Sequence, residues 1–381
     1  MFTHTKQIVR TLFIVTGFSF LYCSCSTEIK PKRSFCSWKT TFPNEWEDDT
    51  IFSKLEIDHI YLRFFDVDWN PYMGEGLPVA TLNYLSLSGR DSMEITPSVF
   101  ITNNVMLYSS KKQLDSLAVN IKNRVDTLIK EFGINNYINS LNYNYNGTAE
   151  YLDSIDLVCE LKFRQQIKEI MIDCDWTEKS RDNYFYFLEE LQEHFKSTPV
   201  SATIRLWQYK YHERAGIPPV DRGLLMCYNL ESSKEYQVEN SISSAWELEK
   251  YLTGKKYPLK LDIALPIFSW AVLFRAGEFK GIINDLTIEN CKQDTLQYAQ
   301  ISENRFVFKN DQVSGDTYIR SGDEIRIEKV STEELEKIAQ LLIDKKIVST
   351  KSRITFFSFD RTYINDYGIE NIDKIYSLFN N

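Results

Sequence analysis

The chain has 381 residues, a formal net charge of -9 and an aromatic-rich composition with 22 tyrosines and 24 phenylalanines. This length predicts one large domain or two modest ones, with ample apolar material for a core. The acidic balance argues against a nucleic-acid partner, because neutralising phosphates requires a basic surface. Exposed aromatic side chains on an acidic protein favour uncharged ligands such as sugars, although aromatic residues also fill cores and acidic surfaces also keep proteins soluble.

The N-terminal residues have the pattern of a secretion signal. Lys6 and Arg10 form a positive region, and the apolar run from Leu12 to Tyr22 is too short to span a bilayer. Ser24-Cys25 follows the run closely, and a cysteine preceded by a small residue is typical of the cleavage site of bacterial lipoproteins. We therefore expect Cys25 to be the lipidated first residue of the mature protein, with ordinary secretion as the alternative.

This pattern predicts how the N-terminal region is divided and where the protein lies. Residues 1–24 would be a signal peptide, and residues 25–50 would be a tether between the lipid and the folded domain. The protein would then lie in the cell envelope and contact the membrane only through its N-terminal lipid.

The other cysteines and the histidines do not form a metal-binding pattern. They are widely spaced along the chain, and no C-x-x-C pair is present. We therefore predict no zinc site, no other metal and no cofactor. The residues concerned are Cys36, Cys159, Cys174, Cys227, Cys291, His59, His194 and His212.

Apolar, β-branched runs alternate with helical patterns along the rest of the chain. The predicted strands are 59–69, 79–85, 94–103, 167–173, 199–207, 222–230, 259–270 and 353–360. The predicted helices are 114–132, 180–195, 243–252 and 331–346, the last beginning with the capping box Ser331-x-x-Glu334. This alternation predicts an α/β fold with parallel strands and crossover helices, and a closed (β/α)8 TIM barrel accommodates eight such strands.

One segment does not fit a plain barrel. Residues 287–330 alternate apolar and polar side chains between turn signals such as "SGD", which is typical of an antiparallel meander. Because the segment falls between strand 7 and helix 7, we expect a small inserted β subdomain on the C-terminal rim. The barrel itself would comprise residues 51–286 and 331–381.

An aspartate pair stands where the fourth predicted strand ends. Asp173 and Asp175 follow the apolar run "EIMI", and residues two apart on a strand face the same side. Ligands of such barrels bind at the C-terminal ends of the strands, so both carboxylates would reach the mouth. Two close carboxylates in a partly dry site cannot both ionise easily, which suits general acid or base catalysis. A buried ion-pair network is the alternative for Asp173.

Other strand ends carry side chains suited to holding a ligand. Arginine and aspartate could bond to hydroxyl groups, and tryptophan rings could stack on the apolar face of a sugar. The tryptophans near strand ends are Trp176, Trp207 and Trp270, and packing between the barrel and its helices is the competing explanation for them. The candidate substrate-binding residues are Arg63, Asp66, Trp176, Arg205, Tyr228, Asn229 and Trp270.

Three of these strand ends carry a resemblance to a known family. "IDCDW" on strand 4, "MCYN" on strand 6 and "LPIFSW" on strand 7 resemble the motif strands of the family-18 glycoside hydrolases, the chitinase-like barrels. The family also has an insertion between strand 7 and helix 7, where residues 287–330 fall. The resemblance covers most of residues 55–360 and implies a glycan ligand. Within it, the chain looks most like barrel lipoproteins of Bacteroidetes type.

The family's functional residues match this sequence only in part. Asp173 and Asp175 match the second and third acidic positions of the strand-4 motif D-x-x-D-x-D-x-E, and Tyr228 matches a tyrosine that holds the N-acetyl group of the substrate. Asn229 stands where the family often has aspartate. Ile170 occupies the position of the first aspartate.

The position of the family's proton donor is the decisive departure. Thr177 stands where the motif has glutamate, and Glu178 lies one residue further on. A shift of one residue turns a side chain to the opposite face of a strand, so Glu178 could act only if the backbone bulges there. General acid assistance contributes about two to four orders of magnitude in rate. Standard chitinase catalysis is therefore expected to be absent or much weakened.

Two functional hypotheses follow from this pattern. The first is an envelope lipoprotein that binds a glycan at the barrel mouth without standard chitinase catalysis. The alternative is an active glycoside hydrolase that uses Asp173 and Asp175 with an acid from outside the motif. The loop 209–223 offers His212, Glu213 and Asp221 for that role, although a solvated connection explains the loop equally.

Overall fold

The computed structural model describes residues 30–42, 46–87, 89–138, 141, 148–253, 256–284, 286–315 and 317–380. The chain divides into two compact units, Met1–Lys30 and Pro31–Asn381, and the features below belong to the second unit. The predicted signal peptide and Cys25 lie outside the described residues.

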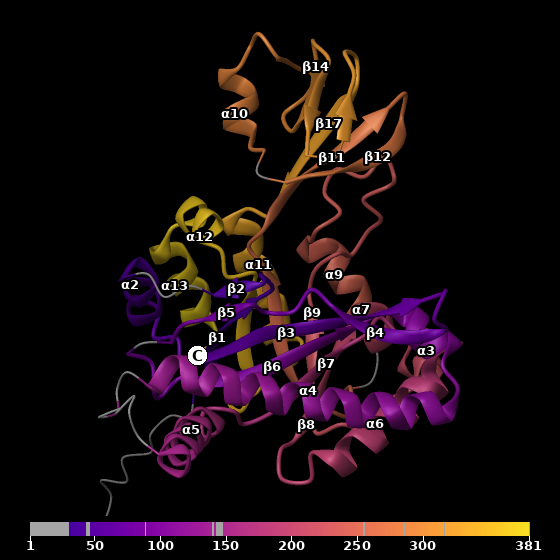
Figure 1. The fold of residues 1–381 in the computed structure, drawn as a ribbon. Coiled ribbons are helices and arrows are strands. Elements are labelled where there is room, and N and C mark those ends of the chain that lie inside the picture. Colours follow the sequence, from indigo (N-terminus) through magenta and orange to yellow (C-terminus); the bar gives the residue numbers. More distant parts are fainter. Residues whose placement is uncertain are drawn as a thin grey trace, which may run out of the picture. The chain divides into compact units, whose positions relative to one another are not determined.

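Eight parallel strands close into a barrel, which confirms the predicted fold class (Figure 1). Each strand pairs with the next, and β18 pairs with β1 to complete the circle. The strands, in order around the barrel, are β1 (Lys32–Ser37), β3 (His59–Asn70), β6 (Glu94–Ile101), β7 (Ile170–Asp173), β8 (Val200–Arg205), β9 (Arg222–Met226), β10 (Lys260–Pro266) and β18 (Arg353–Phe357).

The identity of two strands differs from the prediction. The first barrel strand, β1, lies inside the segment predicted to be a tether, and its Phe35 and Cys36 are buried. The predicted strand 79–85 is not part of the barrel. It is divided between β4 (Glu75–Val79), which pairs antiparallel with β3, and β5 (Tyr84–Leu85), which pairs with β2 (Thr41–Phe42). The predicted number of eight barrel strands was still right, because the unpredicted strand β1 takes the place of the wrongly predicted strand 79–85.

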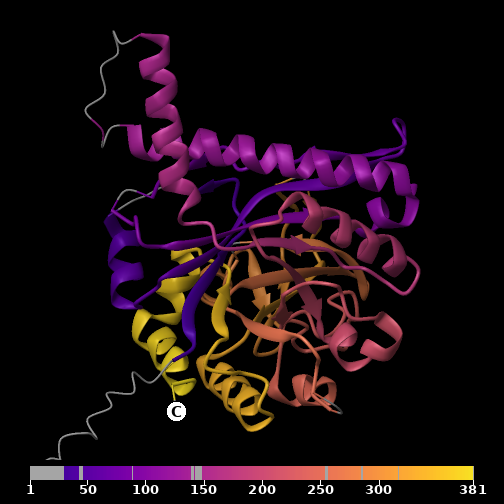
Figure 2. The same ribbon diagram turned by 90° about the horizontal axis from the view of Figure 1, so that it is seen from below.

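Helices surround the barrel, as seen from below in Figure 2. The predicted helices 114–132, 180–195, 243–252 and 331–346 correspond to α4, α6, α9 and α11. The helix bounds are α2 (Trp46–Lys54), α3 (Asn103–Tyr108), α4 (Lys111–Tyr137), α5 (Ala149–Arg164), α6 (Arg181–His194), α7 (Leu206–Lys210), α8 (His212–Ala215), α9 (Ala245–Tyr251), α11 (Thr332–Asp344), α12 (Arg361–Tyr367) and α13 (Ile369–Leu378). In the described part of the chain, no helix is long and apolar enough to cross a membrane.

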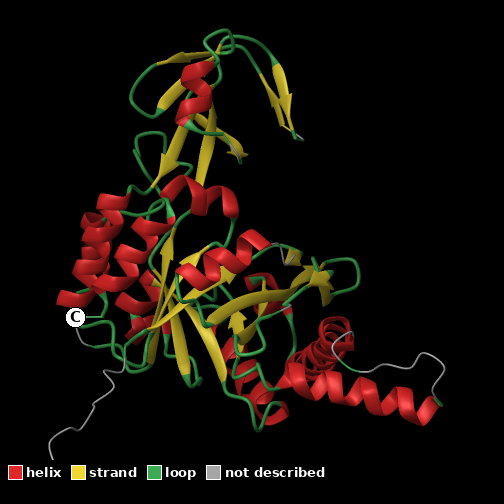
Figure 3. Cartoon of the chain, turned by 90° about the vertical axis from the view of Figure 1, so that its left-hand side faces the viewer, coloured by secondary structure: helices red, strands yellow, loops and turns green. Residues whose placement is uncertain are grey.

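The inserted subdomain lies between β10 and α11, and its strands stand apart from the barrel in Figure 3. It begins at Ser269 rather than at residue 287, because a hairpin with the left-handed turn residues Ala276 and Gly277 precedes the predicted segment. Its elements are β11 (Ser269–Arg275), β12 (Glu278–Ile283), α10 (Ile288–Gln293), β13 (Tyr298–Gln300), β14 (Arg305–Phe308), β15 (Gln312–Ser314), β16 (Thr317–Ile319) and β17 (Glu324–Lys329). A separate hydrophobic core, which includes Phe306 and Ile325, supports this sheet.

A buried ion pair joins the insert to the barrel. Arg326 and Glu328 on β17 are fully buried and lie 2.6 Å apart. Arg326 donates to the carbonyl groups of Ser233 and Glu235 in the loop after β9. Glu328 accepts hydrogen bonds from the Ser241 backbone and hydroxyl in the same loop. The hydrogen bonds of Arg326 and Glu328 therefore hold the loop 231–241 against the sheet of the insert.

A second buried network closes the N-terminal end of the barrel. Arg353 donates to Glu169 at 3.0 Å and to Asp262 at 3.3 Å, while Arg222 lies 2.5 Å from Asp262. The Tyr61 hydroxyl also donates to Asp262, at 2.7 Å. Two cations thus balance two carboxylates in the interior, and each group is hydrogen-bonded.

Removing one member of this network should strongly destabilise the barrel. Arg353→Met leaves Glu169 and Asp262 short of a cation, and breaking such a buried pair costs about 3–5 kcal/mol of unfolding free energy. Urea unfolding measures the loss. The control is Lys374→Met, which removes an exposed pair with Glu336 and should change stability little. Similar losses in both variants would contradict the structural role of the network.

Candidate ligand site at the barrel mouth

Three aspartates lie at the C-terminal end of the barrel, and two of them have an arginine partner. Arg63 holds Asp66 through a bidentate pair and also donates to the Trp38 carbonyl at 2.9 Å. Arg205 holds Asp175 in the same way, at 2.7 and 2.8 Å. The fork geometry fixes these four side chains in position.

Asp173 differs from the other two aspartates because its partner is neutral. The Thr203 hydroxyl on β8 donates to Asp173 Oδ1 at 2.7 Å, and among the described residues no group donates to Oδ2. The side chain is buried, with only 8% of the residue exposed. Burial, and next the charge of Asp175, raise the pKa of Asp173 to about 7. The alternative of an ion-paired Asp173 is therefore wrong.

A cavity of about 390 Å³ lies at this mouth. Its wall combines the ion pair of Asp175 and Arg205 with the rings of Trp207, Tyr228 and Tyr251. Polar groups beside aromatic faces are the usual lining of a small-molecule site. The remaining lining residues are Thr177, Leu206, Asn229 and Leu230.

The loop after β9 brings two of the predicted ligand residues to this cavity. Tyr228 is almost fully buried and stacks on Phe357 with ring centroids 5.1 Å apart. In the part of the chain described, no group bonds to its hydroxyl, and burial raises its pKa well above the usual value. Asn229 has a left-handed backbone with φ of 55°, which turns the chain at the wall of the cavity.

Two predicted tryptophans serve other purposes. Trp176 is fully buried, stacks on Tyr184 and donates to the Ala215 carbonyl at 3.1 Å, so it packs the barrel against its helices and cannot hold a ligand. Trp270 donates to Glu328 at 2.9 Å and belongs to the junction with the insert. The ring that does line the cavity is Trp207, at the start of α7.

Tyr251 is an aromatic residue of the cavity that the sequence analysis missed. It ends α9, where its ring belongs to an amphipathic helix pattern, so only the tertiary structure reveals its place at the mouth. Its hydroxyl donates to the Leu230 carbonyl at 3.3 Å and thereby fixes the loop after β9.

No replacement for the missing proton donor lines the cavity among the described residues. Thr177 lies in the cavity wall, and Glu178 points to Arg214, 2.6 Å away. In the loop 209–223, His212 bonds to the Tyr209 carbonyl, and Asp221 accepts from the Val200 backbone. The cavity wall therefore contains one carboxylate, Asp175, which Arg205 already holds.

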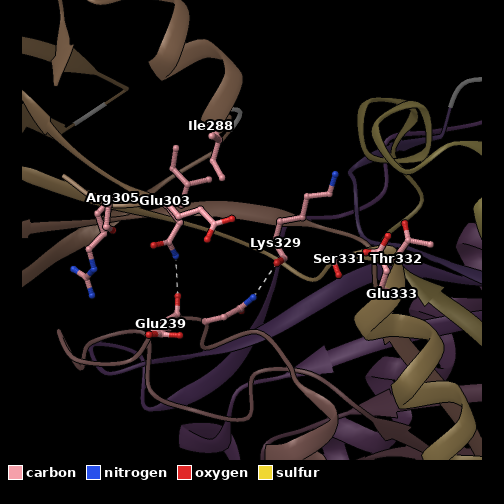
Figure 4. Close-up of a pocket in the computed structure, with 12 residues that line it drawn as sticks. Glu239, Ile288, Glu303, Arg305, Lys329, Ser331, Thr332 and Glu333 are labelled. Carbon is pink, nitrogen blue, oxygen red and sulfur yellow. Dashed lines mark hydrogen bonds between the residues drawn. The ribbon is translucent and has the colours of Figure 1, made fainter. Parts of the chain in front are cut away.

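A larger groove of about 680 Å³ lies at the junction of the insert and α11 (Figure 4). Its two cations are engaged elsewhere: Lys329 pairs with Asp366 at 2.5 Å, and Arg305 donates to the Tyr236 and Val238 carbonyls. The Asn240 amide donates to the Lys329 carbonyl at 2.9 Å. We place the site at the smaller cavity because the groove contains no residue from a barrel strand end.

The described residues contain no group of three or more histidine, cysteine or acidic side chains placed to hold a metal ion. The five cysteines among them are buried and unpaired. Burial raises the pKa of Cys36, which lies inside the barrel, to about 12, so this thiol stays protonated and unreactive near neutral pH.

Comparisons with known proteins concern the fold alone. No family model matches the sequence, and no curated protein matches it. The Bacillus cereus spore cortex-lytic enzyme SleL is 11% identical over 91% of this chain and 74% of that chain, with a TM-score of 0.44. Active domain 2 of a thermostable chitinase from Pyrococcus furiosus is 11% identical over 87% and 85%, with a TM-score of 0.36.

The C-terminal domain of Legionella pneumophila ChiA is 10% identical over 92% of this chain and 97% of that chain, with a TM-score of 0.36. At this level of identity the likeness describes architecture, and the chemistry of the mouth follows from its side chains.

The raised pKa of Asp173 makes stability depend on pH. The carboxyl group of Asp173 stays protonated up to about pH 7 in the folded protein but ionises at its ordinary pKa of 3.8 in the unfolded chain. The contribution of Asp173 to the free energy of unfolding is therefore complete below pH 3.8, and it is lost as the pH rises through the folded-state pKa of about 7. The side chain of the Asp173→Asn variant cannot ionise. As the pH rises from 3.8 to about 7, the free energy of unfolding of this variant should therefore increase relative to that of the wild type, by on the order of 4 kcal/mol.

Urea unfolding at the two ends of this pH range measures the gain. Thr203→Val is the companion variant, because it removes the bond that lowers the Asp173 pKa and should move the transition to higher pH. A difference between wild type and Asp173→Asn that stays constant with pH would refute the shifted pKa.

Proposed function

We propose that the barrel mouth binds an oligosaccharide and that the protein lacks standard chitinase-type hydrolysis. The observation that carries the proposal is the composition of the cavity wall. Aromatic rings lie beside the ion pair of Asp175 and Arg205, and among the described residues the wall contains no carboxyl group without an arginine partner. An aromatic face packs against the apolar face of a sugar ring, while Asp175 and Arg205 together offer acceptors and donors to its hydroxyl groups.

The chemistry of the same wall argues against hydrolysis. A general acid must reach the glycosidic oxygen and carry a proton at the working pH. Both carboxyl oxygens of Asp175 accept from Arg205, and Thr177 has no acidic proton to give. Glu178 is engaged by Arg214 outside the cavity wall.

One observation favours the alternative, an active glycoside hydrolase. Asp173 has a pKa of about 7, which suits an acid or base near neutral pH. Its burial and its absence from the cavity wall weigh against direct contact with a glycosidic oxygen. The two candidates are separated by assaying purified protein for release of shorter oligomers from the saccharides that it binds.

We also propose that the protein is a lipid-anchored component of the cell envelope. The support is the N-terminal sequence pattern that ends at Ser24-Cys25. A single acyl chain anchors a protein weakly, so stable attachment would require the multiple chains carried by a lipoprotein cysteine.

Ligand binding should depend on the ring of Trp207. Trp207→Ala should weaken binding of the oligosaccharide by about 10- to 30-fold, as expected for truncation of an aromatic anchor. Calorimetry with oligomers of glucose, xylose and N-acetylglucosamine provides the measurement. Trp246→Ala is the matched control, because Trp246 is 71% exposed and does not line the cavity. Equal weakening in both variants, or no binding of any oligomer by the wild type, would refute the proposal.

Lipidation depends on one sulfur atom. Cys25→Ser should abolish incorporation of labelled fatty acid and move the protein from the membrane fraction to the soluble fraction, because serine cannot form the thioether. Cys36→Ser, a change at a cysteine inside the barrel, is the control. Labelling that persists in Cys25→Ser would contradict the anchor.

A further inference from the structure

Lysines gather at the N-terminal end of the barrel, where the strands begin. The described residues of 252–260 and 345–352, which lead into β10 and β18, include five lysines and no aspartate or glutamate. Lys345 pairs with Glu249 on α9 at 2.9 Å. The other four are exposed, and no described acidic residue pairs with them. We call these four the basic patch: Lys256, Lys260, Lys346 and Lys351.

Strand register brings part of this charge together. Lys260, the first residue of β10, pairs with Arg222 on the neighbouring strand β9. The parallel register that pairs Ile263 with Ile354 continues three residues back to Lys260 and Lys351. Three cations therefore stand side by side where β9, β10 and β18 begin. Arg222 belongs to the buried network of the barrel, whereas the two lysines are exposed.

The adjoining loops add to the positive charge. Lys168 before β7 and Lys196 before β8 are exposed, and Lys196 lies 4.0 Å from Glu193. Against these lysines stands Asp221 before β9, which accepts from the backbone of Val200. The sector of this end from β7 to β18 is therefore positive, although the whole chain carries a net charge of -9. A local excess of lysine on an acidic protein favours an anionic partner.

The chain also enters the barrel at this end. β1 begins at Lys32, only seven residues after Cys25. An extended chain spans at most about 3.3–3.6 Å per residue, so this link reaches about 25 Å. A lipid on Cys25 would therefore keep the end at which β1 begins close to the bilayer. The insert leaves from the opposite end, because β11 begins three residues after β10 ends (Figure 1).

We propose that the N-terminal end of the barrel lies on an anionic phospholipid surface, with the mouth and the insert directed away from the membrane. The inference goes beyond the glycan site, and it takes its choice of partner from the proposed lipid anchor. Each lysine close to an anionic surface strengthens binding by about fivefold. A lipid chain and a basic patch together attach a protein firmly where either alone is marginal.

Vesicle sedimentation tests the inference on the full mature chain carrying Cys25→Ser, so that neither the anchor nor a sugar contributes. At about 0.01 M salt the protein should bind phosphatidylglycerol vesicles on the order of 10-fold more tightly than neutral phosphatidylcholine vesicles. Binding should fall away at about 0.15 M salt, where the Debye length shortens from about 30 Å to about 8 Å. The same salt dependence explains why the unlipidated protein is expected in the soluble fraction of cells.

The basic patch should account for this binding. The triple variant Lys260→Gln, Lys346→Gln and Lys351→Gln should bind phosphatidylglycerol vesicles on the order of 100-fold more weakly at low salt, because three charges leave the contact. Oligosaccharide binding, measured by calorimetry, should stay unchanged in this variant because the mouth lies at the other end of the barrel.

A matched control removes the same charge from the opposite end of the molecule. Lys179 follows β7, Lys234 follows β9 and Lys292 lies in the insert, and all three are exposed. The triple variant Lys179→Gln, Lys234→Gln and Lys292→Gln should weaken vesicle binding by less than about threefold, since these charges lie beyond the reach of the surface field.

Three outcomes would overturn the inference. They are equal binding to the two kinds of vesicle, equal losses in the two triple variants, and binding of the acidic polysaccharide polygalacturonate without binding of vesicles. The last would assign the basic patch to an anionic saccharide. Each outcome leaves the proposed glycan site and the proposed anchor intact, because neither takes part in the assay.

Discussion

The structure depends on the need to pair every charge inside a closed barrel. Parallel strands direct alternate side chains into a common interior, where an unpaired charge is costly. At the N-terminal end, Arg353 and Arg222 balance Glu169 and Asp262. At the mouth, Arg63 and Arg205 balance Asp66 and Asp175. Asp173 is the exception, and its neutral partner is the feature that distinguishes the ligand end of the barrel from its structural end.

The same rule explains why the insert forms part of the rim. A β sheet attached only by its two ends would be free to swing, but Arg326 and Glu328 are buried against the loop 231–241. That loop continues from Tyr228 and Asn229, which line the cavity. The buried pair therefore fixes the wall of the ligand site through the loop, and Trp270 contributes to this support rather than to the ligand.

The sequence predicted those features that repeat along the chain. Alternating strands and helices revealed the barrel, and the ends of its strands revealed the aspartates. β1 was missed because "KRSFCS" has two apolar residues and lies beside a signal sequence. The roles of Trp176 and Trp207 were not predictable, since both follow strands and only packing against Tyr184 distinguishes the first. The partners of Arg205 and Thr203 likewise depend on the register between neighbouring strands.

The spacing of Asp173 and Asp175 predicts their orientation but not their surroundings. Residues two apart on a strand do share a face, yet Asp173 and Asp175 lie in different environments, because one is buried beside a hydroxyl and the other is partly exposed beside a guanidinium. The raised pKa of Asp173 arises from its burial and then from the neighbouring charge of Asp175, and not from the spacing of the motif. In the proposed function, the remaining aspartates serve recognition at the mouth, while Thr177 stands where the family motif has the glutamate that would cleave a bound sugar.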